Sequence, residues 1–327
     1  MKLAFFDVKS YDYNGFNHYI QGTDIEIQYF ETKLNEKTVS LAAGFDAVCV
    51  FVNDTVNAKV VNKLYEMGIK MIALRCAGFN NVDLHACQGK IAVYRVPAYS
   101  PYAVAEHAMA MLQTNNRRIH KAYNRTREFN FKLTGLAGRD LHGKTVGVVG
   151  TGKIGQIFIN ICKGYGMNVL AYDKFPNPNL GLNYVDLPEL FAKSDFISLH
   201  CPLTPETYHL IGLTAIDQMK PGVMIVNTSR GGLVDTEALI DGIKSKKIGG
   251  ACLDVYEEEG DFFYEDFSGH VVHDDTLVRL IGMPNVIVTS HQAFLTNEAL
   301  NNIAETTVNK ITAFFSGNPN ANTEVHL

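Results

Sequence analysis

The stretch KTVGVVGTGKIGQIF, residues 144–158, decides the fold of this sequence. Its first half is an apolar run of strand length, and its second half has helical spacing. The glycine pattern GxGxxG between them is typical of dinucleotide-binding folds, in which it lets the backbone approach a pyrophosphate at a helix N-terminus. We therefore expect a dinucleotide to bind at this turn, which consists of Gly150, Thr151, Gly152, Lys153, Ile154 and Gly155. The alternative is a glycine turn that binds nothing, with Lys153 merely solvated.

An acidic residue narrows the choice of dinucleotide. The next apolar run, residues 168–173, ends at Asp173. A carboxylate at this position can accept hydrogen bonds from the ribose hydroxyls of NAD, and it would repel the 2′-phosphate of NADP. The sequence therefore favours NAD, although Asp173 could also be a solvated acid at a strand end.

Short apolar runs alternate with helical patterns along the chain, which indicates two α/β domains. Continuous apolar runs are typical of parallel strands that are buried on both faces. The runs expected to be strands are residues 2–8, 47–52, 70–76 and 91–97 in the first series, and residues 144–150, 168–173, 195–202, 222–229, 249–256 and 285–291 in the second. The second series has the strand count of a doubly wound dinucleotide-binding fold.

The remaining segments set the domain boundaries. Residues 101–129 are predicted to form one long connecting helix with Pro101 in its first turn. Residues 296–317 have helical spacing and no following strand, so we expect them to pack on the first domain. The acidic and aromatic residues 257–275 are predicted to be an irregular surface excursion. The predicted domains are residues 1–99 with 298–327, and residues 100–297.

Length and composition restrict the class of protein. A chain of 327 residues, 46% of them hydrophobic, can bury the cores of two domains. A formal net charge of -5 gives no basic field for nucleic acid, so we expect a small-molecule partner. The sequence has no apolar stretch of membrane-spanning length and no signal-peptide pattern, which predicts a cytoplasmic protein. Its six cysteines form no CxxC pair, which argues against a metal site.

Three polar residues that follow apolar runs of the second series have the chemistry to reduce a 2-oxo acid. This reaction requires a cation for the carboxylate, a proton donor for the carbonyl oxygen, and a group that keeps the donor charged. Arg230, Glu259 and His291 supply one of each, beyond strand ends that converge on the ligand site in such folds. Singly, they could be a surface cation, one acid of a run of three, and a structural histidine. Their shared position downstream of the glycine turn favours a catalytic set.

Seven stretches of the chain, in one order, resemble the D-isomer-specific 2-hydroxyacid dehydrogenases, and most of all the bacterial fermentative D-lactate dehydrogenases. They are LRCAGFNNVD (74–83), RVPAYSPYAVAEHA (95–108), VVGTGKIG (148–155), ISLHCPLTPETYHLI (197–211), MIVNTSRGGLVD (224–235), LDVYEEE (253–259) and TSHQAFLT (289–296). The resemblance implies a flavodoxin-like substrate domain and a Rossmann NAD domain with a cleft between them. It also implies an NAD-dependent, reversible reduction of pyruvate to D-lactate.

The resemblance assigns roles to individual residues. Arg230 matches the family's substrate arginine, His291 the general acid, and Glu259 the acid that hydrogen-bonds this histidine and raises its pKa. The run of residues 257–259 leaves the register of the acid open, and Glu259 is preferred because its spacing to Arg230 and His291 resembles the family's. His107 and His120 gain no role and are predicted to be structural. Further cofactor-binding positions that the match implies are Val104, His200, Pro202, Thr207, Asn227, Thr228, Ser229 and Asp254.

The same match implies which residues form the substrate pocket. Backbone N–H groups of Ala77 and Gly78 would bind the carboxylate, and Tyr99 would lie beside the substrate. Phe51 and Phe294 would wall the space for the R group and leave room for a methyl group, hence pyruvate. A methylene in an apolar pocket discriminates by only about 1 to 3 kcal/mol, and both phenylalanines could instead be core residues.

Two alternatives stay open at this point. The chain could act on bulkier 2-oxo acids or on glyoxylate and hydroxypyruvate, or it could be an NAD-sensing transcriptional corepressor on the same scaffold. The helix expected from Pro101 resembles the family's dimer-forming segment, which implies a homo-oligomer, either a dimer or a dimer of dimers.

Overall fold

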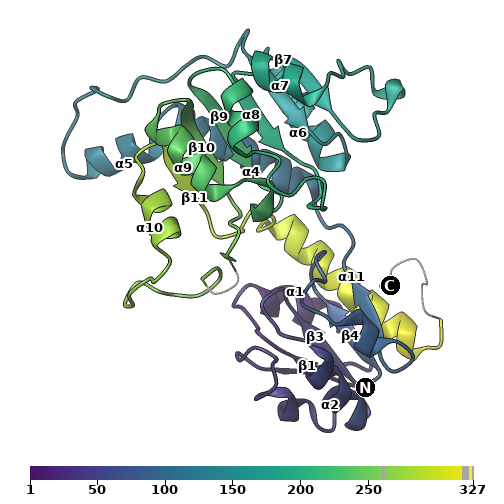
Figure 1. Cartoon of the computed structure of the whole chain (residues 1–327). Helices are drawn as coiled ribbons and strands as arrows, with labels where there is room; N and C mark the ends of the chain where they lie inside the picture. Colours follow the sequence, from purple (N-terminus) through teal and green to yellow (C-terminus); the bar gives the residue numbers. More distant parts are fainter. Residues whose placement is uncertain (260–261, 319–323, 326–327) are drawn as a thin grey trace. The chain divides into compact units, whose positions relative to one another are not determined.

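The computed structural model describes residues 1–259, 262–318 and 324–325. The chain forms two compact units, shown in Figure 1. Unit 1 consists of Met1–Ser100 and Phe294–Leu327, and unit 2 consists of Pro101–Ala293. Each unit has its own parallel sheet, so the prediction of two parallel-sheet α/β domains is confirmed.

Unit 1 is built on a five-stranded sheet in the order β2-β1-β3-β4-β5, which is the flavodoxin-like order. Strands β3 and β4 are buried along their whole length, as parallel strands covered on both faces should be. The elements are β1 (Lys2–Phe5), α1 (Asp12–Tyr19), β2 (Glu26–Tyr29), the 3-10 helix η1 (Val39–Ala42), β3 (Ala47–Val50), α2 (Ala58–Glu66), β4 (Met71–Leu74), α3 (Leu84–Cys87), β5 (Ala92–Arg95) and α11 (Asn297–Phe315).

Strand β2 is the strand of unit 1 that the apolar runs do not predict. It lies at the edge of the sheet, and its residues EIQY alternate between exposed and half-buried. An edge strand of this kind has no continuous apolar run, so the signal that identified its neighbours is missing.

The helix predicted after His291 is α11, and it belongs to unit 1. Figure 1 shows α11, in yellow, beside α1 and β4. Its buried residues Ala304, Val308 and Ile311 join the core formed around Phe5 and Phe16. Thr296 caps the helix by accepting a hydrogen bond from the N–H of Ala299.

Unit 2 contains all six strands predicted for the second series, in the order β11-β10-β9-β8-β6-β7. An isolated parallel bridge from Ala171 to Tyr184 continues the sheet beyond β7, which completes the order of the dinucleotide-binding fold. The order reverses between β6 and β8, and ligands bind at such a reversal. The strands are β6 (Thr145–Val149), β7 (Asn168–Tyr172), β8 (Phe196–Leu199), β9 (Val223–Asn227), β10 (Ile248–Leu253) and β11 (Val286–Val288).

Helices cover both faces of the unit 2 sheet. Buried residues of α4 and α6 share one apolar cluster, and those of α7, α8 and α9 share another with the opposite faces of the strands. The helices are α4 (Pro101–Asn116), α5 (Ile119–Arg127), α6 (Lys153–Gly164), the 3-10 helix η2 (Pro178–Leu180), α7 (Leu187–Lys193), α8 (Leu213–Gln218), the 3-10 helix η3 (Gly231–Leu233), α9 (Thr236–Lys244) and α10 (Asp275–Gly282). No helix in the described ranges is long and apolar enough to cross a membrane.

The prediction of one helix over residues 101–129 is wrong, because the chain breaks into α4 and α5. Arg118 lies between them with a φ of 53°, in the left-handed region. At the end of α4, the Asn115 amide donates to Ala251 and Asn285, and the Asn116 amide donates to Arg139. These bonds hold the end of α4 against neighbouring backbone, whereas α5 has no buried residue that would continue the packed face.

The segment of residues 257–275 is only partly a surface excursion. Residues 260–261 lie outside the described residues. Among the others, Phe263 is 6% exposed and packs with Tyr256 and Leu277. Hydrophobic periodicity does not reveal this small apolar cluster, because Phe263 lies in a turn and packs on Leu277 of α10.

Candidate active site

The glycine turn of unit 2 has the geometry of a pyrophosphate site. Gly150 has a φ of 97°, and a Cβ atom there would lie 2.5 Å from the carbonyl oxygen of His200. A Cβ atom on Gly155 would lie 2.0 Å from the carbonyl oxygen of Gly150, so only glycine permits this approach of helix and strand. Gly152 begins α6 without a side-chain cap, and an added Cβ there would meet nothing within 4 Å. The N-terminus of α6 therefore has N–H groups and open space for an anion.

Two buried polar atoms near the reversal of the sheet also fit a bound dinucleotide. Thr228 Oγ1 and His200 Nδ1, which follow β9 and β8, have no hydrogen-bond partner among the described residues. Burial lowers the pKa of His200 to about 3, so its imidazole is neutral. Buried polar groups normally have partners, and a ligand is one way to supply them.

Asp173 follows β7 and is bonded to the glycine turn. Its Oδ2 accepts hydrogen bonds from the N–H and the hydroxyl of Thr151, at 2.7 and 2.9 Å. Its Oδ1 accepts from the N–H of Phe175 at 2.9 Å. Burial opposes the charge, but these hydrogen bonds keep the pKa of Asp173 below its usual value. The residue therefore presents a carboxylate beside the turn.

The other predicted cofactor positions of unit 2 lie at or after the ends of strands β8, β9 and β10, except Val104. Val104 is buried on α4. In the loop after β8, the hydroxyl of Thr207 donates to the carbonyl of Pro202 at 2.8 Å. After β9, the Asn227 amide donates to the carbonyl of Arg230, and the Ser229 hydroxyl donates to the carbonyl of Leu199.

His291 and Glu259 are brought together. His291 Nδ1 and Glu259 Oε1 are hydrogen-bonded at 2.8 Å, and the second carboxylate oxygen accepts from the N–H of Tyr256 at 3.1 Å. Both side chains are partly exposed, at 22% and 28%. His291 Nε2 has no hydrogen bond to any described residue, so it is the ring nitrogen available to a substrate. The tautomer with a proton on Nδ1 is the one that this pair favours.

Glu257 and Glu259, two acids of the run 257–259, have different partners. The Glu257 carboxylate binds His209 Nε2 at 2.6 Å and accepts from the hydroxyl of Thr236 at 2.7 Å. Glu257 thus attaches the start of this segment to α9, while Glu259 is the acid that contacts His291. The register that spacing left open is therefore decided by contacts.

The backbone of His291 is held in an unusual conformation. Its φ is 51°, in the left-handed region that residues with a Cβ rarely adopt. Its N–H donates to the carbonyl of Asp254 at 2.7 Å, and its carbonyl accepts from the hydroxyl of Tyr264 at 3.0 Å. The completely buried Asp254 carboxylate accepts from the N–H groups of Gln292 and Ala293, at 2.9 and 2.8 Å. Hydrogen bonds on both sides thus fix the backbone at His291, and the bond from Nδ1 to Glu259 orients the imidazole.

Arg230 lies at the same edge of the unit 2 sheet but does not join this pair. Its side chain is exposed, and Nη1 donates to the carbonyl of Ser229 at 2.7 Å. No hydrogen bond or ion pair to another described side chain engages the guanidinium. The next residue, Gly231, packs so closely on Tyr256 that a Cβ atom would lie 2.1 Å from its carbonyl. The backbone of Arg230 is therefore fixed, while its guanidinium can still take up a ligand.

The five predicted substrate residues all lie in unit 1. The ring of Phe294 contacts those of Phe51 and Tyr99, with centroids 6.3 and 6.0 Å apart. The carbonyl of Ala77 accepts from Arg95 Nη1 at 2.7 Å, and that of Gly78 accepts from the Cys76 thiol. The N–H groups of Ala77 and Gly78 donate to no described residue, so they are free to bind an anion. The described ranges contain no group of three or more His, Cys, Asp or Glu side chains arranged to hold a metal ion.

Comparison with known proteins identifies the family. The family described as "D-isomer specific 2-hydroxyacid dehydrogenase, NAD binding domain" matches residues 109–293. The chain belongs to this family. The family prediction and the NAD prediction are therefore confirmed, and this 2-hydroxyacid dehydrogenase is an oxidoreductase.

Named relatives of this 2-hydroxyacid dehydrogenase match over almost its full length. D-lactate dehydrogenase of Escherichia coli (strain K12) is 52% identical over 321 residues, covering 97% of this chain and 98% of that one. The apo-structure of D-lactate dehydrogenase from Escherichia coli superposes with a TM-score of 0.91, covering 99% and 100% of the two chains at 50% identity. A structure described as the pyruvate reductase of Chlamydomonas reinhardtii superposes with a TM-score of 0.94, covering 98% and 97% at 44% identity.

Two residues of this dehydrogenase have no role predicted from the sequence, yet they contact His291 or the neighbouring Asp254. His107 Nε2 lies 3.3 Å from the hydroxyl of Thr289 and 3.4 Å from Asp254 Oδ1. Tyr264 lies in the segment of residues 257–275, and its hydroxyl donates a hydrogen bond to the carbonyl of His291. Nothing in the sequence spacing signals either contact, because the partners are far apart along the chain.

Proposed function

We propose that this protein is an NAD-dependent D-lactate dehydrogenase that reversibly reduces pyruvate to D-lactate. The observation that carries the proposal is the His291–Glu259 pair at 2.8 Å, in the unit that contains the family's NAD binding domain. The D-lactate dehydrogenases and the pyruvate reductase among the relatives support the choice of substrate.

We assign the chemical roles as follows. Bound NADH supplies the hydride for the carbonyl carbon. His291, protonated on Nε2, donates its proton to the carbonyl oxygen, and Glu259 stabilises the imidazolium before transfer. Arg230 binds the substrate carboxylate with its planar guanidinium. In lactate oxidation, the neutral His291 accepts the hydroxyl proton.

The NAD contacts are assigned to one domain. The domain of residues 100–297 would hold NAD, with its phosphates on the glycine turn and its ribose on Asp173. The remaining contacts would come from Val104, His200, Pro202, Thr207, Asn227, Thr228, Ser229 and Asp254. Residues 1–99 with 298–327 would bind the substrate through the N–H groups of Ala77 and Gly78, through Tyr99 and through Phe51, and Phe294 would complete the wall for the R group.

We also propose that the protein is a homo-oligomer, a dimer or a dimer of dimers, in the cytoplasm. Helix α5 has no buried residue, and Phe129, Phe131 and Leu133 after it are 84%, 70% and 80% exposed. An apolar surface of this kind is typical of an interface between protein chains.

Steady-state kinetics over a panel of 2-oxo acids, with chiral analysis of the product, tests the proposed activity. Pyruvate should have the highest kcat/KM, and the product should be D-lactate. A preference for phenylpyruvate, 2-oxoisocaproate, glyoxylate or hydroxypyruvate would overturn the choice of substrate. NADH binding without turnover of any member of the panel would favour the corepressor instead.

Glu259→Gln is expected to lower kcat/KM for pyruvate by about tenfold or more. The carboxylate that bonds His291 Nδ1 at 2.8 Å is replaced by a neutral amide, so the charge-assisted hydrogen bond that orients the imidazole is lost. Glu258→Gln is the matched control, because it removes the same charge from an exposed neighbour. Equal kcat/KM values for Glu259→Gln and the wild type would exclude the assigned role of the pair.

Asp173→Asn is expected to raise the ratio of kcat/KM for NADPH to that for NADH by about tenfold or more, because the repulsion of a 2′-phosphate is lost. The amide oxygen can still accept a hydrogen bond from Thr151, so the glycine turn should keep its support. Asp173→Ala loses both the repulsion of a 2′-phosphate and the hydrogen bond from Thr151, so it should in addition weaken NADH binding. An unchanged ratio in both variants would show that the carboxylate does not select the cofactor.

A further inference from the structure

Arg75 is a buried cation in the core of unit 1, directly behind one of the proposed substrate walls. Its side chain is 2% exposed. Nη1 and Nη2 donate to the carbonyls of Phe6 and Asp7, at 3.0 and 2.5 Å, and Nε lies 3.5 Å from Asp12 Oδ2. The guanidinium carbon lies 4.5 Å from the centroid of the Phe5 ring and 4.8 Å from that of Phe51. These distances are in the range of cation–π attraction to both rings.

The backbone of Phe51 is restrained from two further sides. Its N–H donates to Asp54 Oδ2 at 2.6 Å, and its carbonyl accepts from the Asn81 amide at 2.8 Å. Asp54 is itself buried and accepts a second hydrogen bond from the N–H of Leu34. The main chain of Phe51 is thus fixed independently of Arg75. The ring contacts both the guanidinium and the ring of Phe294, so Arg75 is one of the groups that set the direction of the ring.

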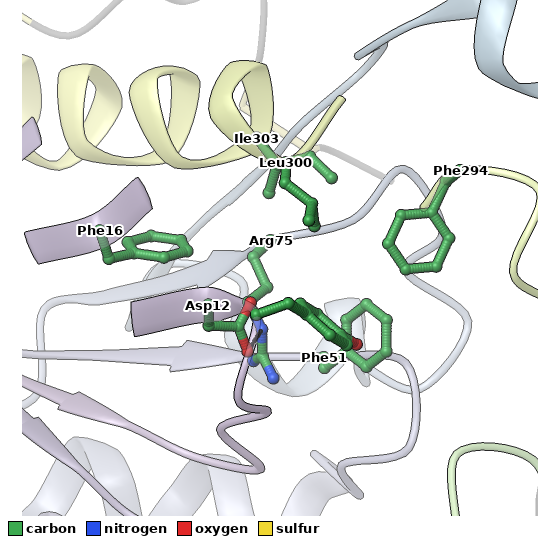
Figure 2. Close-up of a pocket in the computed structure, with 8 residues that line it drawn as sticks. Asp12, Phe16, Phe51, Arg75, Phe294, Leu300 and Ile303 are labelled. Carbon is green, nitrogen blue, oxygen red and sulfur yellow. Dashed lines mark ion pairs between the residues drawn. The ribbon is translucent and has the colours of Figure 1, made fainter. Parts of the chain in front are cut away.

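A small pocket in unit 1 lies beside the Phe51 ring. Its apolar lining includes Phe16, Leu300, Ile303 and Phe294, with Arg75 and Asp12 beside Phe51. Figure 2 shows Arg75 and Asp12 together at the centre of this group, with Phe294 on one side and Phe16 on the other. The pocket has a volume of about 10 Å³, which is room for one water molecule and not for a phenyl ring. Without the guanidinium, the ring could therefore tilt toward this space but not enter it, and the wall that it forms would recede slightly.

A buried ion pair is an unusual way to fill such a position. Desolvation of the two charges offsets most of their attraction, and apolar residues of the same volume often stabilise a core as well. The buried pair of Arg75 and Asp12 is therefore explained better by its effect on the orientation of the Phe51 ring than by a gain in the stability of the core. Asp12 and the two carbonyls hold the guanidinium, and the guanidinium holds the face of Phe51.

We propose that Arg75, held by Asp12, is a positioning residue that sets the upper size limit of the substrate's R group through the ring of Phe51. The proposal rests on the proposed function, in which Phe51 walls the R group of a 2-oxo acid. With the ring fixed, a methyl group is accepted and a branched R group is excluded. With the ring free to tilt toward the pocket, larger 2-oxo acids gain access.

The test is a double-mutant cycle on substrate selectivity, in the full-length enzyme with NADH. Arg75→Lys keeps a charge for Asp12 but loses the planar contact with Phe51 and one of the paired carbonyl bonds. We expect it to lower the ratio of kcat/KM for pyruvate to that for 2-oxoisocaproate by about tenfold, which is the scale on which apolar pockets discriminate. The change should appear mainly in KM, with unaltered NADH affinity. Phe51→Leu should lower the same ratio, and adding Arg75→Lys to Phe51→Leu should lower it no further.

Two measurements keep the result interpretable. Phe5→Leu changes the other ring on the guanidinium, which lies in the core against Phe16, so it should reduce the melting temperature and leave the ratio unchanged. If Arg75→Lys does not fold, the double variant Arg75→Met with Asp12→Asn, which leaves neither charge unpaired, takes its place in the cycle.

The outcomes separate this proposal from the proposed function. Independent, additive effects of the Arg75 and Phe51 substitutions would overturn the positioning role, as would an unchanged ratio in the Arg75 variant. A ratio that changes equally in Phe5→Leu would also overturn it, since general loosening of the core would then suffice. A wild-type enzyme that reduces no 2-oxo acid would instead remove the proposed function itself.

Discussion

Replacing His291 by Gln is expected to reduce kcat for pyruvate reduction by about 10²- to 10⁴-fold, which is the usual contribution of a positioned general acid. Glutamine has a similar reach but no group that can transfer a proton at neutral pH. Because His291 contacts the chain through its backbone and through Glu259, the substitution should leave NADH binding almost unchanged. Stopped-flow measurement of NADH oxidation, together with the Kd of NADH, separates the two quantities.

The matched control for this substitution is His209→Gln. His209 is also paired with a glutamate of the same run, at 2.6 Å from Glu257, but it has no contact with Glu259 or His291. Its loss should reduce stability and leave kcat within about tenfold of the wild type. Equal losses of kcat in the two variants would mean that structural support, not proton transfer, accounts for the effect of His291.

Arg230→Lys should lower kcat/KM for pyruvate by about 10²- to 10³-fold, comparable to the removal of one preorganised donor from an active site. A lysine keeps the charge but cannot bind a carboxylate with two parallel hydrogen bonds. The side chain of Arg230 is exposed, and within the described ranges it bonds to the neighbouring carbonyl of Ser229 and to no other group, so little stability should be lost. Unchanged melting temperature with a large kinetic defect is the expected combination.

Arg279→Lys provides the comparison for this arginine. Arg279 is a partly exposed arginine of unit 2 that binds Glu237 at 3.4 Å. Its replacement should change the free energy of unfolding by no more than about 1 kcal/mol, as for other surface ion pairs, and should leave kcat/KM for pyruvate unchanged. A wild-type rate for Arg230→Lys would remove Arg230 from the substrate site and shift the carboxylate contact to the N–H groups of Ala77 and Gly78.

The strands could be predicted from sequence because parallel strands buried on both faces need continuous apolar runs. Apolar runs predicted all six strands of unit 2. They did not predict β2, which lies at a sheet edge and is half exposed. The single helix over residues 101–129 was the larger error. Local helical spacing continues past Asn116. Helix α4 nevertheless ends at Asn116, because Asn115 and Asn116 bond to distant backbone and Arg118 has a left-handed conformation.

The site was predictable to the extent that residues follow strand ends. Spacing placed Glu259 and His291 in positions that the fold brings within 2.8 Å. It could not reveal that Glu257, two residues earlier, has a separate set of partners in His209 and Thr236. Nor could it find Tyr264 or Arg75, because their importance depends on three-dimensional contacts that leave no trace in the order of residues.

The left-handed backbone at His291 has a consequence for how the enzyme can be improved. A residue with a Cβ held at a φ of 51° stores of order 1–3 kcal/mol of conformational strain. The hydrogen bonds to Asp254 and Tyr264 sustain that strain, so the imidazole is already oriented before a substrate arrives. Selection for thermal stability alone would replace His291 with glycine or asparagine, which tolerate this conformation. In the role proposed for His291, durability and turnover therefore make opposite demands on this residue, and stabilising changes should be sought elsewhere in the chain.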